Sequence, residues 1–233
     1  LSRNGKPILD KSRLGFILKE DTLAGHLEIT EALHHSFSGT WEQIWGEDRI
    51  VENNYHEMTI RVQKTSTPKR KFNVVFRLFN DGFGFRYEFP EQEALKDFVI
   101  MDELTEFALT GDHKAWSIPY EAHFYEALYE ASPVSKLGWV STPLTMETND
   151  GLFLSIHEAN LTDYAAMNLI PKEGSMTLKA NLTPWSTGEK VFMKAPGVTP
   201  WRTMIVAESA GDLLLSRLML NLNEPCRIQD TSW

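Results

Sequence analysis

The sequence has a single cysteine, Cys226, so it cannot form an internal disulfide. It has no apolar run long enough to span a membrane. It also lacks a Gly-rich phosphate loop and any Cys/His spacing typical of zinc sites. Acidic residues outnumber basic ones by 32 to 23, giving a net charge of -9. That balance argues against nucleic acid, because binding to phosphates requires clustered Lys and Arg.

The remaining composition is that of a globular protein. Its 233 residues are 42% hydrophobic and 11% aromatic, enough for a sizeable core in one large β domain or two small ones. Cys226 follows Pro225 in a tail without periodicity, which does not suggest a catalytic nucleophile. The chain begins at Leu1 without a signal peptide, which fits a fragment of a longer protein.

Residues 72–89 give the clearest hairpin pattern. Apolar and aromatic side chains alternate with polar ones on both sides of a turn signal at Asp81-Gly82. A two-residue turn there would set Arg77 opposite Arg86. Like charges directly across a strand pair are unfavourable, so we expect acids such as Glu88 to intervene.

Few helices are expected. One short helix is predicted over Asp212–Leu220, with Asp212 as its N-cap. Residues 220–233 have no periodicity and are predicted to form an extended segment that leaves the domain.

The segment around residue 158 organises the rest of the prediction. Asn149–Gly151 is a turn signal, and it is followed by a strand in which Leu152, Leu154 and Ile156 share one face. Glu158 continues that apolar face. A buried acid is costly unless a cation meets it, so Glu158 needs a positively charged partner.

Five segments, taken in order, resemble the N-terminal domain of glycoside hydrolase family 97; they are Trp41–Met58, Asn80–Pro90, Trp116–Tyr129, Gly151–Met167 and Thr199–Pro225. Full-length members of that family carry an N-terminal β-super-sandwich, a central (β/α)8 barrel and a small C-terminal β domain. The resemblance therefore implies an all-β fold, a galactose-mutarotase-like β-super-sandwich of antiparallel sheets with few short helices. It also implies a domain over residues 1–225 and a linker over residues 226–233, leading toward a catalytic barrel that this chain lacks.

The resemblance implies function as well. The parent enzyme would be a calcium-dependent hydrolase of α-glucosides or α-galactosides, periplasmic or secreted from a bacterium, with an oligosaccharide substrate. This domain would pack on its own barrel. The family's catalytic acids lie in the barrel, so no catalytic residue is expected here, and the chain alone is predicted to be inactive.

Glu158 matches the glutamate that the family's N-terminal domain lends to a calcium ion. Calcium favours carboxylate oxygens, and the other ligands would be glutamates of the barrel, so the site would be shared. From the residues alone, the favoured interpretation of Glu158 is a salt-bridged or solvated acid at a strand end. His157 lies on the opposite face and is expected to be structural.

Two other functions remain open. A free-standing carbohydrate-binding β-sandwich would stack sugars on exposed aromatic rings, with candidates Trp41, Trp45, Trp116 and Trp139. An aldose epimerase on the same superfold would use His and Glu on a concave sheet, with candidates His123 with Glu121, or His157 with Glu158. Glu121 and Glu126 resemble a glycosidase carboxylate pair, but such pairs are common in an acidic chain, and we expect no catalytic role for them.

Overall fold

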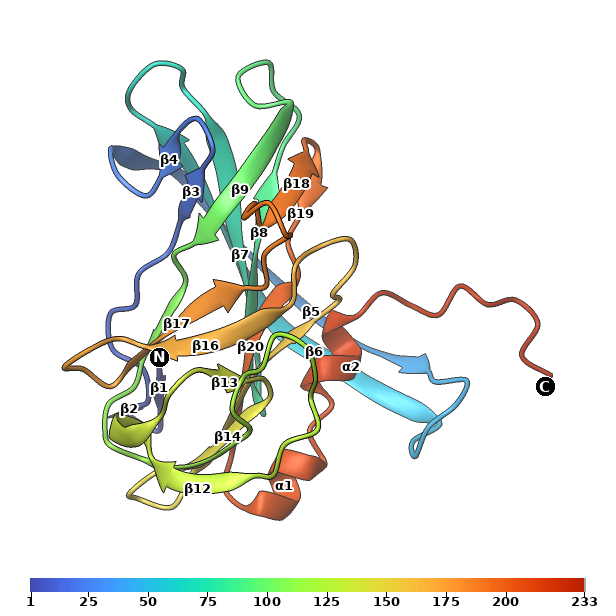
Figure 1. Cartoon of the computed structure of the whole chain (residues 1–233). Coiled ribbons are helices and arrows are strands. Elements are labelled where there is room, and N and C mark those ends of the chain that lie inside the picture. Colours follow the sequence, from blue (N-terminus) through green and yellow to red (C-terminus); the bar gives the residue numbers. More distant parts are fainter. Residues whose placement is uncertain (233) are drawn as a thin grey trace.

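The computed structural model describes residues 1–232 and consists mainly of antiparallel strands (Figure 1). The first ten strands are β1 (Ser2–Arg3), β2 (Lys6–Pro7), β3 (Phe16–Leu18), β4 (Thr22–Leu23), β5 (Leu27–Glu42), β6 (Ile50–Lys64), β7 (Lys71–Phe79), β8 (Gly82–Phe89), β9 (Asp97–Glu103) and β10 (Glu106–Ala108). The others are β11 (Lys114–Ser117), β12 (Glu130–Pro133), β13 (Val140–Ser141), β14 (Leu144–Glu147), β15 (Phe153–Ala159), β16 (Met167–Pro171), β17 (Thr177–Leu182), β18 (Val191–Lys194), β19 (Gly197–Val198) and β20 (Trp201–Ala207). A 3-10 turn, η1 (Val134–Lys136), and two helices, α1 (Ala210–Leu214) and α2 (Leu218–Leu222), complete the described chain.

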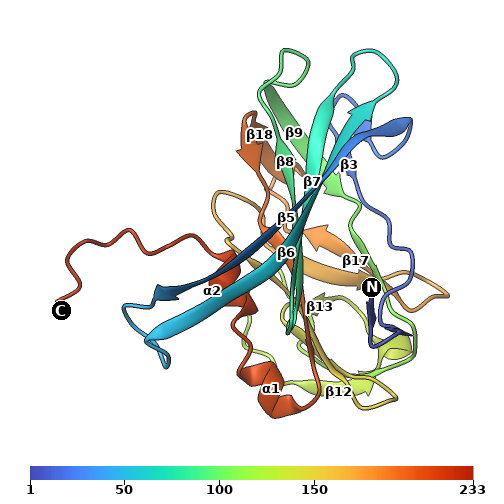
Figure 2. The same ribbon diagram turned by 180° about the vertical axis from the view of Figure 1, so that it is seen from behind.

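A ten-stranded sheet forms one layer of the molecule, in the order β12-β11-β14-β15-β20-β8-β7-β6-β5, with β19 attached to β8. Two four-stranded sheets, β10-β17-β16-β13 and β18-β9-β3-β4, lie against one face of it, and Figure 2 shows the large sheet from the other side. The predicted all-β super-sandwich is confirmed.

The main core lies between the large sheet and the two smaller ones. The large sheet contributes Tyr87, Leu154 and Ile156, and the smaller sheets contribute Ile100 and Leu169, all with no exposed surface. Alternation along each strand explains this arrangement, since every second side chain points toward the facing layer. Leu154 and Ile156 therefore lie where the sequence predicted.

A smaller apolar cluster covers the outer face of the large sheet. Helix α2 packs Leu218 and Leu222 against Trp201 of β20 and against Val75 and Phe79 of β7. The two helices have five residues each, and no helix among residues 1–232 is long and apolar enough to cross a membrane.

The prediction of one helix capped by Asp212 is wrong. The Ser209 hydroxyl oxygen accepts a hydrogen bond from the Asp212 amide, so Ser209 is the N-cap of α1 and Asp212 lies in the first turn. The chain then breaks before α2, where Asp81 Oδ2 accepts hydrogen bonds from the Ser216 hydroxyl and the Arg217 amide. Asp81 thus satisfies the Arg217 amide, a backbone donor that a continuous helix would have used internally.

The predicted register of the β7–β8 hairpin is also wrong. Its two turn residues are Asn80 and Asp81, and Phe79 pairs with Gly82. Gly82 belongs to β8 because it pairs with Phe79 and with Ile205 of β20. Its φ is 151°, and a Cβ atom there would lie 2.2 Å from the Met204 carbonyl oxygen. Only glycine tolerates both conditions.

The corrected register separates the two arginines that were expected to face each other. Arg77 lies opposite Gly84, and Arg86 lies opposite Val75. Each arginine has its own acid: Arg77 pairs with Glu57 at 2.8 Å, and Arg86 pairs with Glu88 at 2.7 Å.

Residues 223–232 contain no helix or strand and extend away from the body of the molecule (Figure 1). The predicted linker begins within this segment, and its final residue, Trp233, lies outside the described residues.

Candidate functional site

Glu158 and Arg202 face each other across the β15–β20 strand pair. Arg202 Nη1 donates a hydrogen bond to Glu158 Oε2 at 2.5 Å. The second carboxylate oxygen of Glu158, Oε1, accepts a hydrogen bond from the Met167 amide of β16 at 2.9 Å. Both oxygens of Glu158 therefore already have protein partners, and the residue is only 7% exposed.

Arg202 also binds a second carboxylate. Its Nε and Nη2 donate to Glu103 Oε1 at 2.9 Å and Oε2 at 2.7 Å, the bidentate geometry in which guanidinium and carboxylate match best. Both residues have no exposed surface, and the Tyr164 hydroxyl donates a third hydrogen bond to Glu103. We call Glu103, Glu158 and Arg202 the ion cluster. It joins β15 and β20 of the large sheet to β9 of one small sheet, while the Glu158–Met167 bond reaches the other.

The charges within the ion cluster shift the pKa values of Glu103 and Arg202. Burial raises the pKa of Glu103, but the charge and hydrogen bonds of Arg202 outweigh burial and hold that pKa below its ordinary value. Burial lowers the pKa of Arg202, yet the two carboxylates raise it overall, so the guanidinium stays charged. The cluster carries one surplus negative charge, and hydrogen bonds from neighbouring groups offset part of its burial cost.

In the domain by itself, the surroundings of Glu158 are those of the salt-bridged alternative. Each of its oxygens accepts one hydrogen bond, and the Arg202 guanidinium supplies the cation that a buried acid needs. Within residues 1–232, no three His, Cys, Asp or Glu side chains are grouped closely enough to hold a metal ion. The predicted site takes only one ligand from this chain and the others from a barrel, so the shared calcium site stays a prediction.

The sequence indicated that Glu158 needs a cation but identified neither Arg202 nor Glu103. A signal for Arg202 was present, since it is the one charged residue in the otherwise uncharged strand Trp201–Ala207. A lone arginine in a fully buried strand is typical of an internal ion pair. Glu103 ends a strand of mixed exposure, so nothing local distinguished it from a surface acid.

The structure does not assemble the residues proposed for an epimerase. His157 and Glu158 are adjacent on β15 and therefore point to opposite faces of the sheet. Burial lowers the pKa of His157, and its Nδ1 has no hydrogen-bond partner among the described residues. Glu121 and His123 are both exposed, in the loop between β11 and β12.

Glu126 lies in the same loop and is also exposed. Its side chain accepts a hydrogen bond from the neighbouring Tyr125 amide. No hydrogen bond joins Glu126 to Glu121 in the described chain.

The structure brings together two of the four tryptophans proposed for sugar stacking. Trp41 and Trp45 line one cavity of about 670 Å³, together with the buried Trp201. Trp116 instead lies on β11, with the Lys114 ammonium 4.5 Å from its ring centre. Trp139 is 52% exposed near Tyr120, away from that cavity.

A comparison with known families decides the identity. The sequence profile of the family described as Glycosyl-hydrolase 97 N-terminal matches residues 1–225. The chain belongs to that family. The predicted family resemblance is therefore confirmed.

Solved structures of family 97 enzymes agree with this assignment over the whole chain. An enzyme of the family from Pseudoalteromonas sp. strain K8 has 38% sequence identity and a TM-score of 0.96, covering 100% of this chain. Structures of that enzyme in complex with panose and with acarbose superpose with a TM-score of 0.95. A β-arabinopyranosidase, at 22% identity and a TM-score of 0.79, shares the fold.

Two curated relatives are retaining α-galactosidases. The enzyme from Bacteroides thetaiotaomicron is 25% identical and covers 99% of this chain, and a probable one from Streptomyces bingchenggensis is 26% identical and covers 100%. The family 97 chain described here spans only 38% and 35% of those two proteins and 36% of the Pseudoalteromonas enzyme. It therefore corresponds to about a third of the length of each of these relatives.

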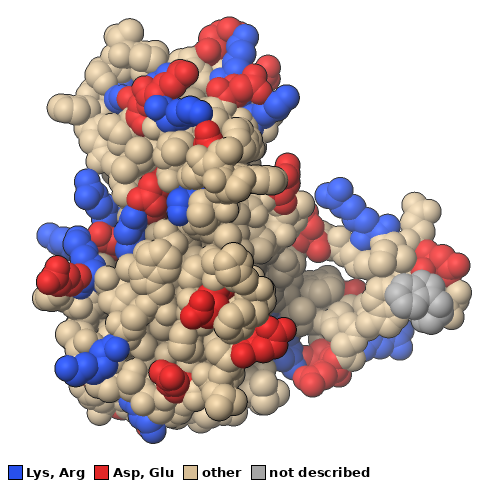
Figure 3. Space-filling model, in the orientation of Figure 1, with Lys and Arg blue, Asp and Glu red and all other residues tan. Residues whose placement is uncertain are grey.

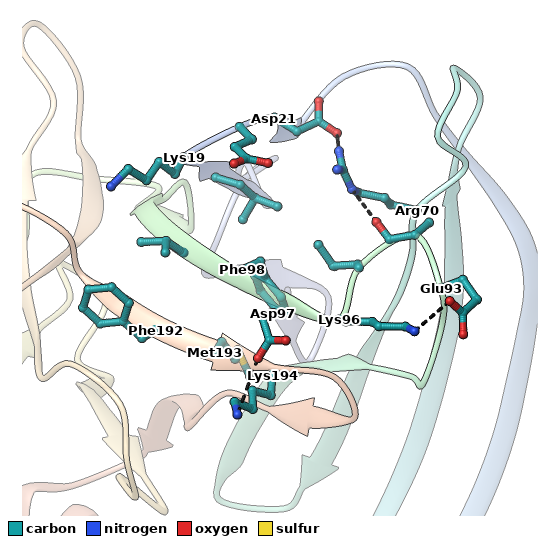
Figure 4. A pocket seen from close by; sticks show the side chains of 15 residues that line it. Lys19, Asp21, Arg70, Glu93, Lys96, Asp97, Phe98, Phe192, Met193 and Lys194 are labelled. Carbon is teal, nitrogen blue, oxygen red and sulfur yellow. Dashed lines mark hydrogen bonds and ion pairs between the residues drawn. The ribbon is translucent and has the colours of Figure 1, made fainter.

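A second cavity, of about 690 Å³, opens between β3, β9 and β18 of this family 97 domain (Figure 4). The charged side chains labelled in Figure 4 all have partners of opposite charge. Asp21 pairs with Lys64 and Arg70, Lys96 with Glu93, Lys194 with Asp97, and Lys19 with Glu189. Glu20 also lines the cavity and is in none of these pairs, so among the described residues the cavity offers no unpaired cation for recognising a ligand.

Proposed function

We propose that this chain is the N-terminal domain of a glycoside hydrolase that acts on α-galactosides or α-glucosides. The observation that carries the proposal is the asymmetry of coverage. The Pseudoalteromonas enzyme matches this chain along its full length, yet the chain accounts for only 36% of that enzyme. The remaining part of such an enzyme would carry the reaction.

The proposed substrate class follows from the relatives. The curated ones are retaining α-galactosidases, and the solved enzyme was obtained with panose and acarbose. The α-galactosidases and the enzyme solved with panose and acarbose have in common a ligand with an α-linked terminal sugar. The proposal therefore includes both α-galactosides and α-glucosides.

The role proposed for the domain is to pack against the catalytic (β/α)8 barrel without performing catalysis itself. The ion cluster supports this role, because its carboxylates are buried and bound to Arg202 rather than presented to a substrate. A glycosidase needs a pair of accessible carboxylates flanking the sugar. Glu158 as a calcium ligand shared with the barrel stays a prediction, since each of its oxygens keeps a lone pair besides its present hydrogen bond. The periplasmic or secreted location stays a prediction.

Assays of two polypeptides would test the proposal. One is the 233-residue chain, and the other is the chain extended by whatever follows Trp233 in its gene. Both are assayed with p-nitrophenyl α-galactoside and α-glucoside. We expect hydrolysis by the extended polypeptide alone. An extended polypeptide without a barrel sequence, or without activity on either sugar, would contradict the proposal.

A further inference from the structure

One part of the large sheet extends beyond its neighbours. Strands β5 and β6 pair continuously as far as Glu42 and Ile50, but β7 accompanies β6 only from His56 to Gln63. Residues 37–42 and 50–55 therefore form a two-stranded ribbon, which we call the ribbon. Figures 1 and 2 show it projecting from the body on the side where the C-terminal segment leaves. A two-stranded ribbon is only marginally stable without a packing partner.

The ribbon has one face directed toward helix α2. Trp41 Nε1 donates a hydrogen bond to Asn221 Oδ1 at 2.8 Å, and Asn221 Nδ2 donates to the Glu52 carbonyl oxygen at 2.9 Å. Next to these bonds, Val51 is only 1% exposed. An ion pair between Asp48 and Arg217 closes the turn onto the start of α2. These contacts fix the ribbon at an angle to the body.

The space between the ribbon and α2 is the cavity of about 670 Å³. Its walls combine aromatic and apolar side chains, among them Trp41, Ile44 and Trp201, with an equal share of polar and charged ones. The two arginines in the wall, Arg77 and Arg86, lie over the Trp201 ring at 4.9 and 4.6 Å and are already paired with acids. The cavity therefore has no surplus positive charge and does not fit an anion.

Two polar atoms in this wall remain unsatisfied. Asn53 Oδ1 and Gln43 Oε1 are buried and have no hydrogen-bond partner among the described residues. A buried acceptor without a donor costs free energy, typically about 1–3 kcal/mol. An occupant that completes this wall would supply apolar surface together with N–H or O–H donors, which is the composition of a folded protein surface.

The course of the chain indicates which protein surface that is. Asn223 and Cys226 line the mouth of the cavity, and Thr231 lines a further hollow against the ribbon turn, Glu42–Arg49. The polypeptide thus leaves the domain along the ribbon. The family model is that of an N-terminal domain, so under the proposed function the catalytic part would follow at this point. Attachment at that point keeps the following part at a high effective concentration beside the ribbon.

The exposed side chains on this part of the molecule are consistent with an interface. Ile44, Trp45 and Ile50 are 44%, 43% and 56% exposed around the turn of the ribbon. In Figure 3 this part projects beside the body and carries both acidic and basic residues. Apolar side chains surrounded by mixed charges are the usual composition of an interface between domains.

We infer that the cleft between the ribbon and α2 is the surface on which the catalytic part of the same polypeptide packs. This inference rests on the proposed function and specifies where the two parts meet. Under this inference, the ribbon forms part of an interface between domains and lacks its packing partner in the isolated domain.

Hydroxyl-radical footprinting of the extended polypeptide, read by mass spectrometry, tests the inference. Trp45 is the probe and Trp185 the internal control, since they are 43% and 62% exposed in this domain. We expect the oxidation rate of Trp45 to be lower than that of Trp185 by a factor of about five or more, because residues at the core of an interface lose contact with solvent. Rates in proportion to the two exposed fractions would overturn the inference.

A matched pair of variants gives an independent readout in the same polypeptide. Ile44→Asp should reduce the rate of hydrolysis or separate the unfolding of the two parts, because it places a charge in the interface. Phe192→Asp, at a site 58% exposed on β18, should do neither. Equal behaviour of the two variants would count against docking at the ribbon. The activity of the unsubstituted extended polypeptide tests the proposed function separately. If that polypeptide is active but its Trp45 is oxidised as fast as its exposure predicts, only the docking surface is refuted.

Discussion

Arg202 and Glu158 occupy opposed positions on β20 and β15, and the guanidinium lies 2.5 Å from the carboxylate inside the core. The same guanidinium holds Glu103 through two bonds, at 2.9 and 2.7 Å. Glu158, for which the family resemblance implied a calcium ligand, is thus part of the ion cluster that joins the sheets. This relationship leads to the first three predictions.

Replacing Arg202 with Met should destabilise the domain strongly. The substitution leaves Glu103 and Glu158 buried without their cation, which typically costs about 3–5 kcal/mol. Urea unfolding of both proteins measures the difference. Arg49→Met is the matched control, because Arg49 makes a single ion pair with Glu42 and its side chain is 82% exposed, so no measurable loss is expected. Similar stabilities of the Arg202 and Arg49 variants would contradict the role of the ion cluster.

Calcium should leave the stability of the 233-residue chain unchanged. Glu158 already has two protein partners, and a ligand that binds only the folded state would otherwise raise the melting temperature. Melting temperatures in excess CaCl₂ and in EDTA should therefore agree. A rise with calcium that disappears in Glu158→Gln would show that this carboxylate does bind the ion.

Acid should weaken the contribution of Glu103. Burial raises its pKa, but Arg202 lowers it further, so the folded-state pKa lies below the ordinary value of 4.5. A carboxyl group with a depressed pKa stabilises the fold above its unfolded pKa, and this stabilisation is lost as pH falls through the folded value. The difference in unfolding free energy between wild type and Glu103→Gln should stay constant from about pH 7 to about pH 5 and shrink at lower pH. A difference that grows on acidification would disprove the assignment.

Gly82→Ala should destabilise the β7–β8 hairpin. The new Cβ atom would lie 2.2 Å from the Met204 carbonyl oxygen, and φ at this position is 151°. Backbone cannot move aside cheaply, so the loss should be about 2 kcal/mol or more. Gly138→Ala serves as control, because a Cβ there meets nothing within 4 Å. Thermal unfolding of the two variants should differ clearly, and equal melting temperatures would argue against this geometry.

Local alternation was enough to predict the strands of the core. Leu154 and Ile156 lie on the predicted buried face, and the same pattern correctly placed Glu158 among them. Register was harder to predict. Asp81-Gly82 has the composition of a turn, yet Gly82 belongs to β8 because a neighbouring strand approaches it closely, a tertiary fact invisible in the local sequence.

The candidate site illustrates the same limit. A need for a cation near Glu158 followed from its apolar neighbours, but the residues that meet in the ion cluster are far apart in the sequence. Arg202 is 44 residues from Glu158 and 99 residues from Glu103. The family resemblance implied a calcium ligand at the same position, and only the packed structure showed that Arg202 and the Met167 amide bind its two oxygens. The predicted start of the helix was wrong for a simpler reason. Ser209 and Asp212 are both good N-cap residues, and the sequence alone does not show which of them caps α1.

The most direct test of the central claim is hydrolysis of p-nitrophenyl α-galactoside and α-glucoside by three samples: the 233-residue chain, the separately produced part that follows it, and a mixture of the two. We predict no turnover by the chain alone and an increase in activity when it is added to the catalytic part. Turnover by the chain alone, at a rate matching the complete enzyme, would contradict the claim.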